Sequence, residues 1–508
     1  MSNQSANNKR IAKNTLYMYI RMVVVMAVTL YTSRVVLDSL GVEDFGIYNV
    51  VGGIIAMFRI LNGALTDASQ RFITFELGKG DRGDVNNIFS QCLVLHFLLG
   101  IIVVAVAEPI GIWFLNNKLM IPSERLNAAF WIYQFTIISM FVMFISVPYN
   151  ALIVAHEKMS AFAAISIIDA LLRLVVAYAL YIQGIDKLIL YGALMLLTQI
   201  ILRLVYTIYC RRNFKSSEFK FIWNTHIIKK MGQFASWTIL GNMSYLLTTQ
   251  GLNLLLGMFF NPIINAARGI AVQVQGAIET FVRNFQTAIN PQITKYYASG
   301  NFERMHKLVF TSSRFSFFLM MIPILPLLFE TEQILQLWLG KVPEYVVGFT
   351  RIVLLISWVT TLLNPLEVSV KASGRIRKFE IVIYGLKLLV LPIAYIFLRL
   401  GASPLSVFGI QLIIELTAYF VSIFITSKDV GFMVLRYMKD VLLVIVPTTL
   451  FSLLLPIVLV RTVDVSVGRF FLLTIFSTIW SLIIVLIIGT SKEEKIFIKN
   501  KISCLRKK

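Results

Sequence analysis

The twenty residues VLLVIVPTTLFSLLLPIVLV, at positions 441–460, contain no charged side chain and do not alternate between polar and apolar residues. A helix of this length is about 30 Å long, which is the thickness of the hydrocarbon core of a membrane. A strand of a membrane β-barrel would instead alternate apolar and polar residues over about ten positions. The stretch therefore predicts a helix that crosses a membrane.

The whole chain has the composition of such helices. Of its 508 residues, 57% are hydrophobic and 14% are charged, whereas soluble domains are about 25% charged. Apolar blocks of about twenty residues recur along the chain, separated by short polar segments. We therefore predict an all-α polytopic membrane protein. Because no loop exceeds about 25 residues, a catalytic domain outside the membrane has no room, and we expect a transporter without catalytic residues and not an enzyme.

We predict fourteen transmembrane helices, and this even number places both termini on one side of the membrane. They are expected at residues 14–38, 45–66, 88–107, 127–149, 160–183, 187–209, 233–259, 266–289, 308–329, 347–366, 379–399, 404–426, 440–460 and 468–489.

The net charge of +21 comes from Lys and Arg residues between the apolar blocks and at the C-terminus. If the N-terminus is cytoplasmic, the cytoplasmic segments hold about thirty of them and the opposite loops about six, as the positive-inside rule requires. The basic residues are therefore interpreted as topology signals and not as a nucleic-acid site. The first 13 residues lack an apolar stretch with a cleavage site, so no removable signal peptide is expected. We expect a bacterial cytoplasmic (inner) membrane protein with both termini in the cytoplasm.

Two regions of the chain repeat at nearly equal spacing. The segment ITFELGKGD at 73–81 resembles ITKYYASGN at 293–301, and each follows a second span. Further on, three residues recur 217 positions later: Pro148, Ala155 and Phe162 correspond to Pro365, Ala372 and Phe379. A six-helix repeat predicts two parallel, pseudo-symmetric lobes around a central substrate path.

This repeat predicts the domain organisation, with two further helices after the second lobe. The expected segments are a cytoplasmic N-terminus (1–13), an N-lobe (14–210), a basic cytoplasmic linker (211–232), a C-lobe (233–426), the last two helices (440–489) and a basic cytoplasmic tail (490–508).

Several arginines lie inside the predicted spans, where a charge is costly unless it faces a wet cavity or a partner. Counted from the cytoplasmic ends, Arg21, Arg59 and Arg283 all lie about 10 Å deep. Arg34 and Arg268 lie nearer the outer face. Because the planar guanidinium stays charged and binds phosphate oxygens in bidentate fashion, these five residues predict a cationic cavity for an anionic substrate.

Other charges in the spans have a structural alternative. Asp169 and Glu279 each stand four residues before an arginine, so internal ion pairs with Arg173 and Arg283 are an equal interpretation, as is Arg34 with Asp38. Lys387 and Glu415 lie in neighbouring spans and are expected to face each other. Asp169, Glu279, Glu415 and Lys387 are candidates either for Na⁺ or H⁺ coupling or for plain salt bridges. No phosphate-binding loop or zinc motif is present, so no cofactor or metal is expected.

The opening stretch, with NTL at 14–16, LGVEDFGIYNV at 40–50 and QRFIT at 70–74, resembles the polysaccharide-export branch of the multidrug/oligosaccharidyl-lipid/polysaccharide (MOP) exporter superfamily, close to Wzx-type O-antigen flippases. The resemblance implies a MATE-like V shape of two six-helix lobes plus two C-terminal helices. It implies alternating access that carries an undecaprenyl-pyrophosphate-linked oligosaccharide for O-antigen, capsule or lipopolysaccharide synthesis. In the similar lipid II flippases, cationic residues on the first, second and eighth helices line the cavity.

The resemblance also implies partners, namely membrane lipids, a polysaccharide polymerase and glycosyltransferases. Three alternatives remain open from the sequence. A MATE-type multidrug/cation antiporter would use acids in its cavity, a membrane-embedded polymerase or ligase would need a large outer loop, and a scaffold would need no arginines at matched depth.

Overall fold

The computed structural model describes residues 2–56, 59–117, 122–182, 184, 186–260, 262–339, 342–491 and 494–495. It divides into two compact units, an N-terminal unit (Ile11–Asn242) and a C-terminal unit that comprises the chain from Met243 onward together with residues 2–10. The described residues form helices joined by short turns and contain no β-strand.

The first helix is interrupted where the sequence places the first predicted turn. Helix α1 (Ser2–Ala56) has a non-helical residue at Gly41, with φ 77° and ψ 170°. This conformation suits glycine because a Cβ atom would clash with the backbone at positive φ. Gly41 therefore separates the two segments on which the spans at 14–38 and 45–66 were expected to lie.

The N-terminal unit continues with six long helices, the last of which runs on into the C-terminal unit, and three short 3₁₀ turns. They are α2 (Arg59–Gly78), η1 (Gly80–Arg82), α3 (Val85–Asn117), η2 (Ser123–Arg125), α4 (Leu126–Ala155), α5 (Met159–Ala179), α6 (Lys187–Asn213), η3 (Lys215–Ser217) and α7 (Thr225–Phe259).

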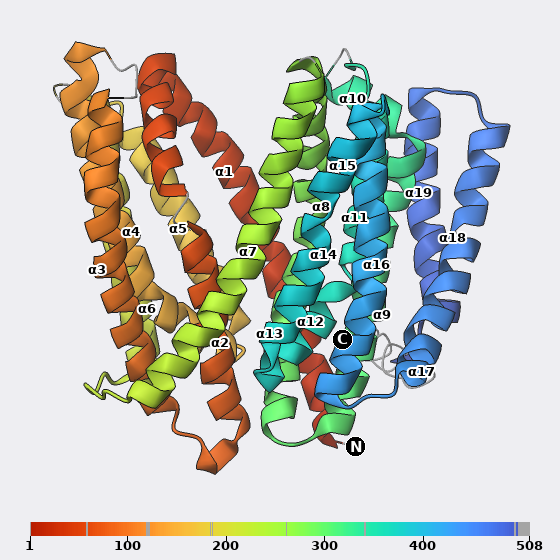
Figure 1. The fold of residues 1–508 in the computed structure, drawn as a ribbon, viewed down its shortest axis with the longest axis horizontal. Coiled ribbons are helices and arrows are strands. Elements are labelled where there is room, and N and C mark those ends of the chain that lie inside the picture. Colours follow the sequence, from red (N-terminus) through yellow and green to blue (C-terminus); the bar gives the residue numbers. More distant parts are fainter. Residues whose placement is uncertain are drawn as a thin grey trace, which may run out of the picture. The chain divides into compact units, whose positions relative to one another are not determined.

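Helix α4 is the centre of this unit, where it packs against α2, α3, α5 and α6 (Figure 1). Its core contact with α3 is the perpendicular ring pair Phe89 and Tyr149, whose centroids are 5.0 Å apart. Ile73 of α2, which is fully buried, joins the same cluster. Apolar helices of this kind associate by close packing, since lipid is as apolar as their side chains.

The C-terminal unit has more broken helices. Its elements are α8 (Pro262–Ala298), α9 (Phe302–Phe329), α10 (Thr331–Leu339), α11 (Val346–Thr360), α12 (Leu363–Ser373), α13 (Ile376–Phe379), η4 (Glu380–Tyr384), α14 (Gly385–Leu388), α15 (Val390–Arg399), α16 (Pro404–Val430), α17 (Val434–Tyr437), η5 (Met438–Leu442), α18 (Leu443–Thr462), α19 (Val467–Ile484) and η6 (Val485–Gly489). The segments η4, η5 and η6 are π-helical turns within longer helices. The break between α11 and α12 precedes Pro365, whose ring cannot donate a backbone hydrogen bond.

The two units pack their helices in the same order. In the N-terminal unit α2 contacts α3 and α4, while α6 contacts α4 and α5. In the C-terminal unit α8 contacts α9, α11 and α12, while α16 contacts α11, α12 and α15. The broken helix α11–α12 thus takes the place of α4, and the segments α13–α15 take the place of α5.

The backbone repeats as well. Gly80 and Gly300, which lie at the same place in the two similar sequence segments, both have positive φ (62° and 74°) directly after a long helix. Glu157 (φ 58°) and Gly374 (φ 78°) are 217 residues apart and both follow the helices that contain Pro148 and Pro365. The repeat read from the sequence therefore corresponds to a repeated turn geometry.

The boundary between the units falls inside α7. The linker predicted at 211–232 packs with the N-terminal unit, because Phe214 and Met231 are buried in its core cluster. Further along α7, Leu252 and Leu256 belong to a core cluster of the C-terminal unit. One helix thus supplies apolar residues to both cores.

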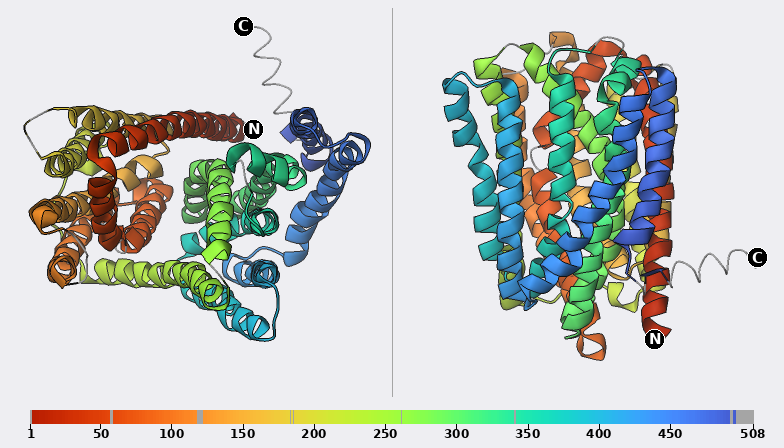
Figure 2. Two further views of the ribbon diagram at one scale, coloured as in Figure 1. Left: turned by 90° about the horizontal axis from the view of Figure 1, so that it is seen from above. Right: turned by 90° about the vertical axis from the view of Figure 1, so that its right-hand side faces the viewer.

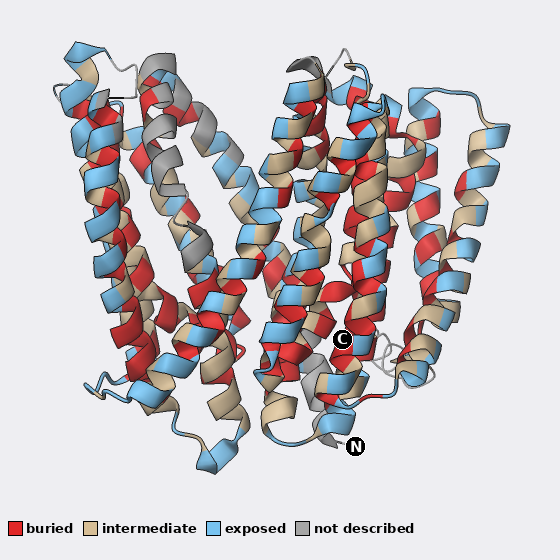
Figure 3. Ribbon diagram, in the orientation of Figure 1, coloured by how far each residue is buried: buried red, intermediate tan, exposed pale blue. Residues whose placement is uncertain are grey.

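The last two long helices form a hairpin on the C-terminal unit. Helices α18 and α19 pack on each other and on α9, and Figure 2 draws the hairpin in blue. Buried and exposed residues alternate along both helices (Figure 3). At one end of α9, Glu330 forms a buried ion pair with Arg469 of α19, with an Nε–Oε1 distance of 2.8 Å. In the middle of α9, Arg314 pairs with Glu494 at 2.7 Å.

Ten helices of the described ranges are long and apolar enough to cross a membrane, so the chain is a multi-pass membrane protein. They correspond to ten of the spans expected from the sequence. The remaining four expected spans fall on α1, α2, α7 and α8, which are long but more polar. In α8 alone, Gln275, Glu279 and Arg283 follow one another at four-residue spacing and so share one face.

Candidate functional site

A polar cluster lies among the helices of the N-terminal unit and contains Arg21, the first arginine predicted for the cavity. The Arg21 guanidinium lies over the ring of Phe162 on α5, 4.8 Å from its centroid. Asp169 of α5 and Tyr206 of α6 are close enough to act on it electrostatically. Tyr206 in turn accepts a hydrogen bond from Asn150 of α4 at 3.2 Å. Residues of α5 and α6 thus surround this arginine of α1, and α4 positions Tyr206.

Arg21 is held by an aromatic ring and not by a carboxylate. Asp169 directs its carboxylate to Arg173, with an Nε–Oδ1 distance of 2.8 Å, as their four-residue spacing predicts. In the described part of the chain, no acid forms an ion pair with Arg21, and its buried Nε has no hydrogen-bond partner. A ring attracts a cation through its π face but leaves the N–H groups free for an anion. Arg21 is therefore arranged to bind an anion.

A second arginine of this unit has the same kind of partner. Arg203 of α6 lies 4.1 Å from the ring centroid of Tyr149 and donates to the Thr207 hydroxyl at 3.1 Å. We did not predict a substrate role for Arg203 from the sequence, because its position near the end of a span favoured a side chain directed to the headgroups.

In the C-terminal unit, the Glu279 carboxylate is the centre of a hydrogen-bonded group. It accepts from Gln275 Nε2 and from Ser357 Oγ, both at 2.8 Å. It also pairs with Arg283 at 3.3 Å, as the spacing predicts. The Arg283 side chain remains 74% exposed, so this ion pair leaves most of the guanidinium open.

Arg268 has a different environment from Arg283 on the same helix. It is 5% exposed and donates to the Asn253 side chain and to the Thr249 carbonyl at 2.9 Å. Both acceptors belong to α7, so Arg268 fastens α7 to α8 inside the C-terminal unit. The sequence could not predict this, because neither acceptor is charged.

Lys387 and Glu415 face each other, as expected from their positions in neighbouring spans. Lys387 Nζ lies 2.9 Å from Glu415 Oε2, and the two side chains are 12% and 11% exposed. Lys387 belongs to α14, between the π-helical turn η4 and the break at Leu389. π-helical turns inside longer helices occur frequently at functional sites. The pair thus combines a buried charge with an irregular backbone.

The side chains of Arg34 and Arg59 lie outside the described part of the structure. The predicted pair of Arg34 with Asp38 and the predicted cavity position of Arg59 therefore stay predictions. The predicted common depth of Arg21, Arg59 and Arg283 also stays a prediction.

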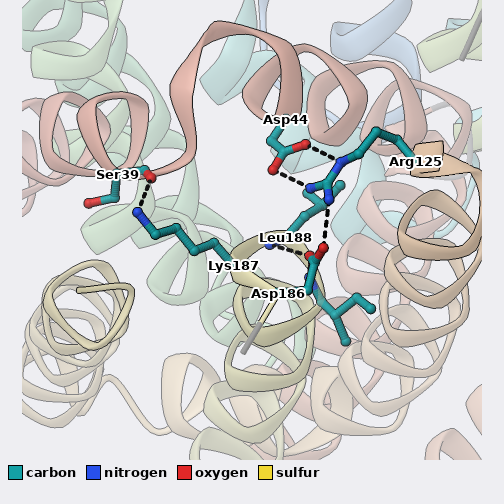
Figure 4. A network of polar contacts seen from close by, with 7 residues as sticks. Ser39, Asp44, Arg125, Asp186, Lys187 and Leu188 are labelled. Atoms are coloured by element: carbon teal, nitrogen blue, oxygen red, sulfur yellow. Dashed lines mark hydrogen bonds and ion pairs between the residues drawn. The ribbon is translucent and has the colours of Figure 1, made fainter. Parts of the chain in front are cut away.

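A charged network that the sequence did not predict ties three segments of the N-terminal unit together (Figure 4). Arg125, which ends η2, forms ion pairs with Asp44 of α1 and, at 2.6 Å, with Asp186. Asp186 caps α6 by accepting from the backbone N–H groups of Leu188 and Ile189. Lys187 donates to the Ser39 carbonyl beside the Gly41 break at 3.1 Å.

The network also sets the protonation of one acid outside the spans. Burial by itself raises the pKa of the Asp186 carboxyl, but the Ile189 N–H and the Arg125 guanidinium outweigh it and hold that pKa below its usual value. Asp186 is therefore ionised under ordinary conditions.

In the described ranges, no three His, Cys, Asp or Glu side chains are grouped so that they could hold a metal ion. The free thiols Cys92 and Cys210 are both buried in the N-terminal unit.

The fold is that of MATE transporters of the MOP superfamily. A multidrug-resistance MATE family transporter in an outward-facing conformation matches 85% of this chain and 97% of its own, with a TM-score of 0.72 and 14% identity. A MATE structure in the bent conformation matches 85% of this chain and 96% of its own, with a TM-score of 0.71 and 17% identity.

A third solved structure with this fold is a MOP superfamily transporter from Pyrococcus furiosus, described by the reverse polarity of its binding pocket and a suggested different function. It matches 84% of this chain and 96% of its own, with a TM-score of 0.68 and 16% identity. No protein-family model and no curated protein matches the sequence. The likeness to solved structures therefore shows the fold alone.

Proposed function

We propose that this protein is a flippase that moves an undecaprenyl-pyrophosphate-linked oligosaccharide outward across the bacterial cytoplasmic membrane. It would supply repeat units for O-antigen, capsule or lipopolysaccharide synthesis. The observation that carries the proposal is Arg21, a guanidinium inside the first helix whose partner is the Phe162 ring and not a carboxylate. A pyrophosphate needs such a donor, because an unpaired ion in hydrocarbon costs tens of kcal/mol.

The polarity of α1, α2, α7 and α8 supports a water-filled path across the membrane. These long helices are not among the ten that are apolar enough to cross a membrane by composition. Polar faces inside a membrane have to meet water, protein or substrate. We infer that these four helices complete the set of fourteen spans and that their polar faces meet water, with Arg283 exposed on α8 as a second candidate for binding phosphate.

Ion coupling forms part of the proposal. Asp169, Glu279 and Glu415 are acids inside the helices, and each is paired with a basic residue. Uptake of H⁺ or Na⁺ at one of them would release that partner, which is a change in charge able to drive alternating access. Glu415 is the first choice, because its partner Lys387 lies beside a π-helical turn.

The second candidate function is a MATE-type multidrug or cation antiporter. It is favoured by the solved structures with this fold, among them a multidrug-resistance transporter. The Pyrococcus furiosus transporter has the same fold, and the reverse polarity of its binding pocket suggests a different function for that protein. The two functions differ in what Arg21 does, because a cationic drug gains nothing from a guanidinium in its path.

The test is the lipid-linked intermediate that accumulates when the gene is deleted. We expect mass spectrometry of the lipid fraction to find polyprenyl-pyrophosphate oligosaccharide trapped on the inner leaflet, and expression of the wild-type chain to remove it. Arg21→Ala should leave the intermediate trapped at normal protein level. The matched control is Arg304→Ala, which removes an exposed arginine at the start of α9 and should restore transport. A deletion strain with normal lipid-linked sugars and increased drug sensitivity would favour the antiporter.

A further inference from the structure

The connection between α6 and α7 exposes three large aromatic side chains within five residues. Phe219, Phe221 and Trp223 are 49%, 75% and 54% exposed. They alternate with Lys220 and Ile222 in a stretch without helix. Alternate residues of an extended chain point to the same side. Single exposed apolar residues are ordinary on proteins, but a group of three calls for an apolar partner.

The backbone of this stretch is fixed to the N-terminal unit. Phe214 is buried and stacks on His156, with ring centroids 4.1 Å apart. Asn86 Nδ2 donates to the carbonyls of Ser216, at 3.2 Å, and Glu218, at 2.7 Å. The Lys220 N–H donates to the hydroxyl of Ser90 at 3.1 Å. Because these contacts hold the backbone against α3, the three rings are presented outward by the fold.

Residues 211–230, which comprise this connection and the adjoining ends of α6 and α7, are strongly basic. Their exposed cations flank and separate the aromatic residues, whereas Glu218 is the one carboxylate between residues 211 and 230. These cations are Arg211, Arg212, Lys215, Lys220, Lys229 and Lys230. The described structure records no ion pair for any of the six, so their charge is available to an anionic partner.

The position of the connection identifies that partner. Helix α6 ends at Asn213 and is one of the ten helices apolar enough to cross a membrane. The residues just after such a helix lie at the level of the lipid headgroups. Aromatic rings concentrate at this level, and clustered Lys and Arg are attracted to anionic headgroups there.

We propose that residues 211–230 form a binding surface for anionic phospholipids. The rings of Phe219, Phe221 and Trp223 lie among the headgroups, and the six basic side chains pair with lipid phosphates. The surface fixes this edge of the N-terminal unit at the membrane boundary, whatever the cargo of the transporter is. The proposal therefore does not depend on the flippase function.

The test measures the depth and the lipid preference of Trp223 in the full-length protein. The chain is reconstituted in phosphatidylcholine bilayers with and without phosphatidylglycerol, with bromine atoms placed either near the headgroups or near the chain ends. The Trp223 signal is the fluorescence difference between the wild type and Trp223→Phe, which keeps an aromatic ring. We expect headgroup-proximal bromine to quench this signal at least twofold more strongly than bromine at the chain ends.

The preference for anionic lipid is tested by changing Arg211, Arg212, Lys215 and Lys220 to Gln together. Phosphatidylglycerol and low salt should increase the quenching in the wild type, and this increase should disappear in the variant. Trp338→Phe is the matched control, because Trp338 is 51% exposed but lies on α10, outside the basic segment; its signal should not respond to phosphatidylglycerol. An unquenched Trp223, quenching that is equal in both lipids, or a protein bound at this segment in place of lipid would overturn the proposal.

Discussion

The two units of this protein pack their helices in the same order but differ in the partners of four of their cations. In the N-terminal unit, Arg21 and Arg203 lie over the rings of Phe162 and Tyr149. In the C-terminal unit, Lys387 and Arg469 are paired with carboxylates. A ring leaves a guanidinium able to bind an incoming anion, whereas a carboxylate competes with that anion. The guanidinium of Arg21 is therefore open to an anion, whereas the charges of Lys387 and Arg469 are already neutralised by their partners.

The largest effect is expected where one charge of the Lys387–Glu415 pair is removed. Glu415→Leu leaves a buried ammonium without a partner, and Lys387→Met leaves a carboxylate, so each should lower the free energy of unfolding by about 3–5 kcal/mol. The double variant should recover most of that loss. Thermal unfolding in detergent measures both effects. If the double variant is stable but inactive in transport, the pair serves coupling; if it is stable and active, the pair serves stability alone.

Arg21 should lose function without losing stability. Arg21→Ala removes a charged hydrogen-bond donor to the anion, which is expected to reduce transport roughly ten- to a hundredfold. Arg21→Lys should keep part of the activity, because an ammonium is a cation without the planar fork. Complementation of the deletion strain measures transport, with the protein level as the control. If Arg21→Ala transports as well as the wild type, Arg21 does not bind the anion and this difference between the two units has no functional meaning.

The Arg125 network should make stability depend on pH. Because its pKa is lowered in the folded state, Asp186 contributes stability that is fully present above the unfolded pKa of about 3.9 and is lost as the pH falls through the lower native pKa. Asp186→Asn removes one ion pair and weakens the cap of α6, and should cost about 1–2 kcal/mol at neutral pH.

Unfolding temperatures of the wild type and Asp186→Asn, measured between neutral and acidic pH, check this prediction. The difference between them should shrink below about pH 4. A constant difference across the range would mean that the charge of Asp186 contributes nothing and that its cap is the whole effect.

The smallest effect tests the repeat itself. Gly80 and Gly300 both have positive φ, and a Cβ at either would meet open space, so Ala should cost only the backbone strain of about 1 kcal/mol at each position. Asn, which tolerates this conformation, should cost less. Clearly unequal losses for Gly80→Ala and Gly300→Ala in thermal unfolding would show that the two turns do not play the same part.

Much of the fold could be predicted from the sequence, because apolar blocks of membrane length leave few alternatives. The Gly41 break falls between the first two predicted spans, and the hairpin α18–α19 corresponds to the last two. The breaks at η4 and after α11 could not be placed, since a proline or a charge in a span indicates a bend but not its position. The predicted linker at 211–232 was assigned by charge, whereas Met231 packs in the core of the N-terminal unit.

The contacts of the candidate site could likewise be predicted from the sequence only in part. The pairs of Asp169 with Arg173 and Glu279 with Arg283 follow from helical spacing, and the sequence also shows that no acid stands three or four positions from Arg21. Arg268 has neutral partners, so no pattern of charges reveals it. Arg125 joins Asp44 and Asp186 across large sequence separations, and Arg469 joins Glu330 in the same way. Only the fold brings such residues together.

The two ion pairs on α9 also determine whether the C-terminal hairpin can be detached. Glu330 directly follows α9 and Arg314 lies in the middle of it, so removing the chain from α18 onward would leave an acid and a base without their partners. A shortened protein would therefore need both residues replaced in the same step. Inheritance of the hairpin is thus tied to two positions more than a hundred residues upstream, and its loss would require coordinated change at distant sites.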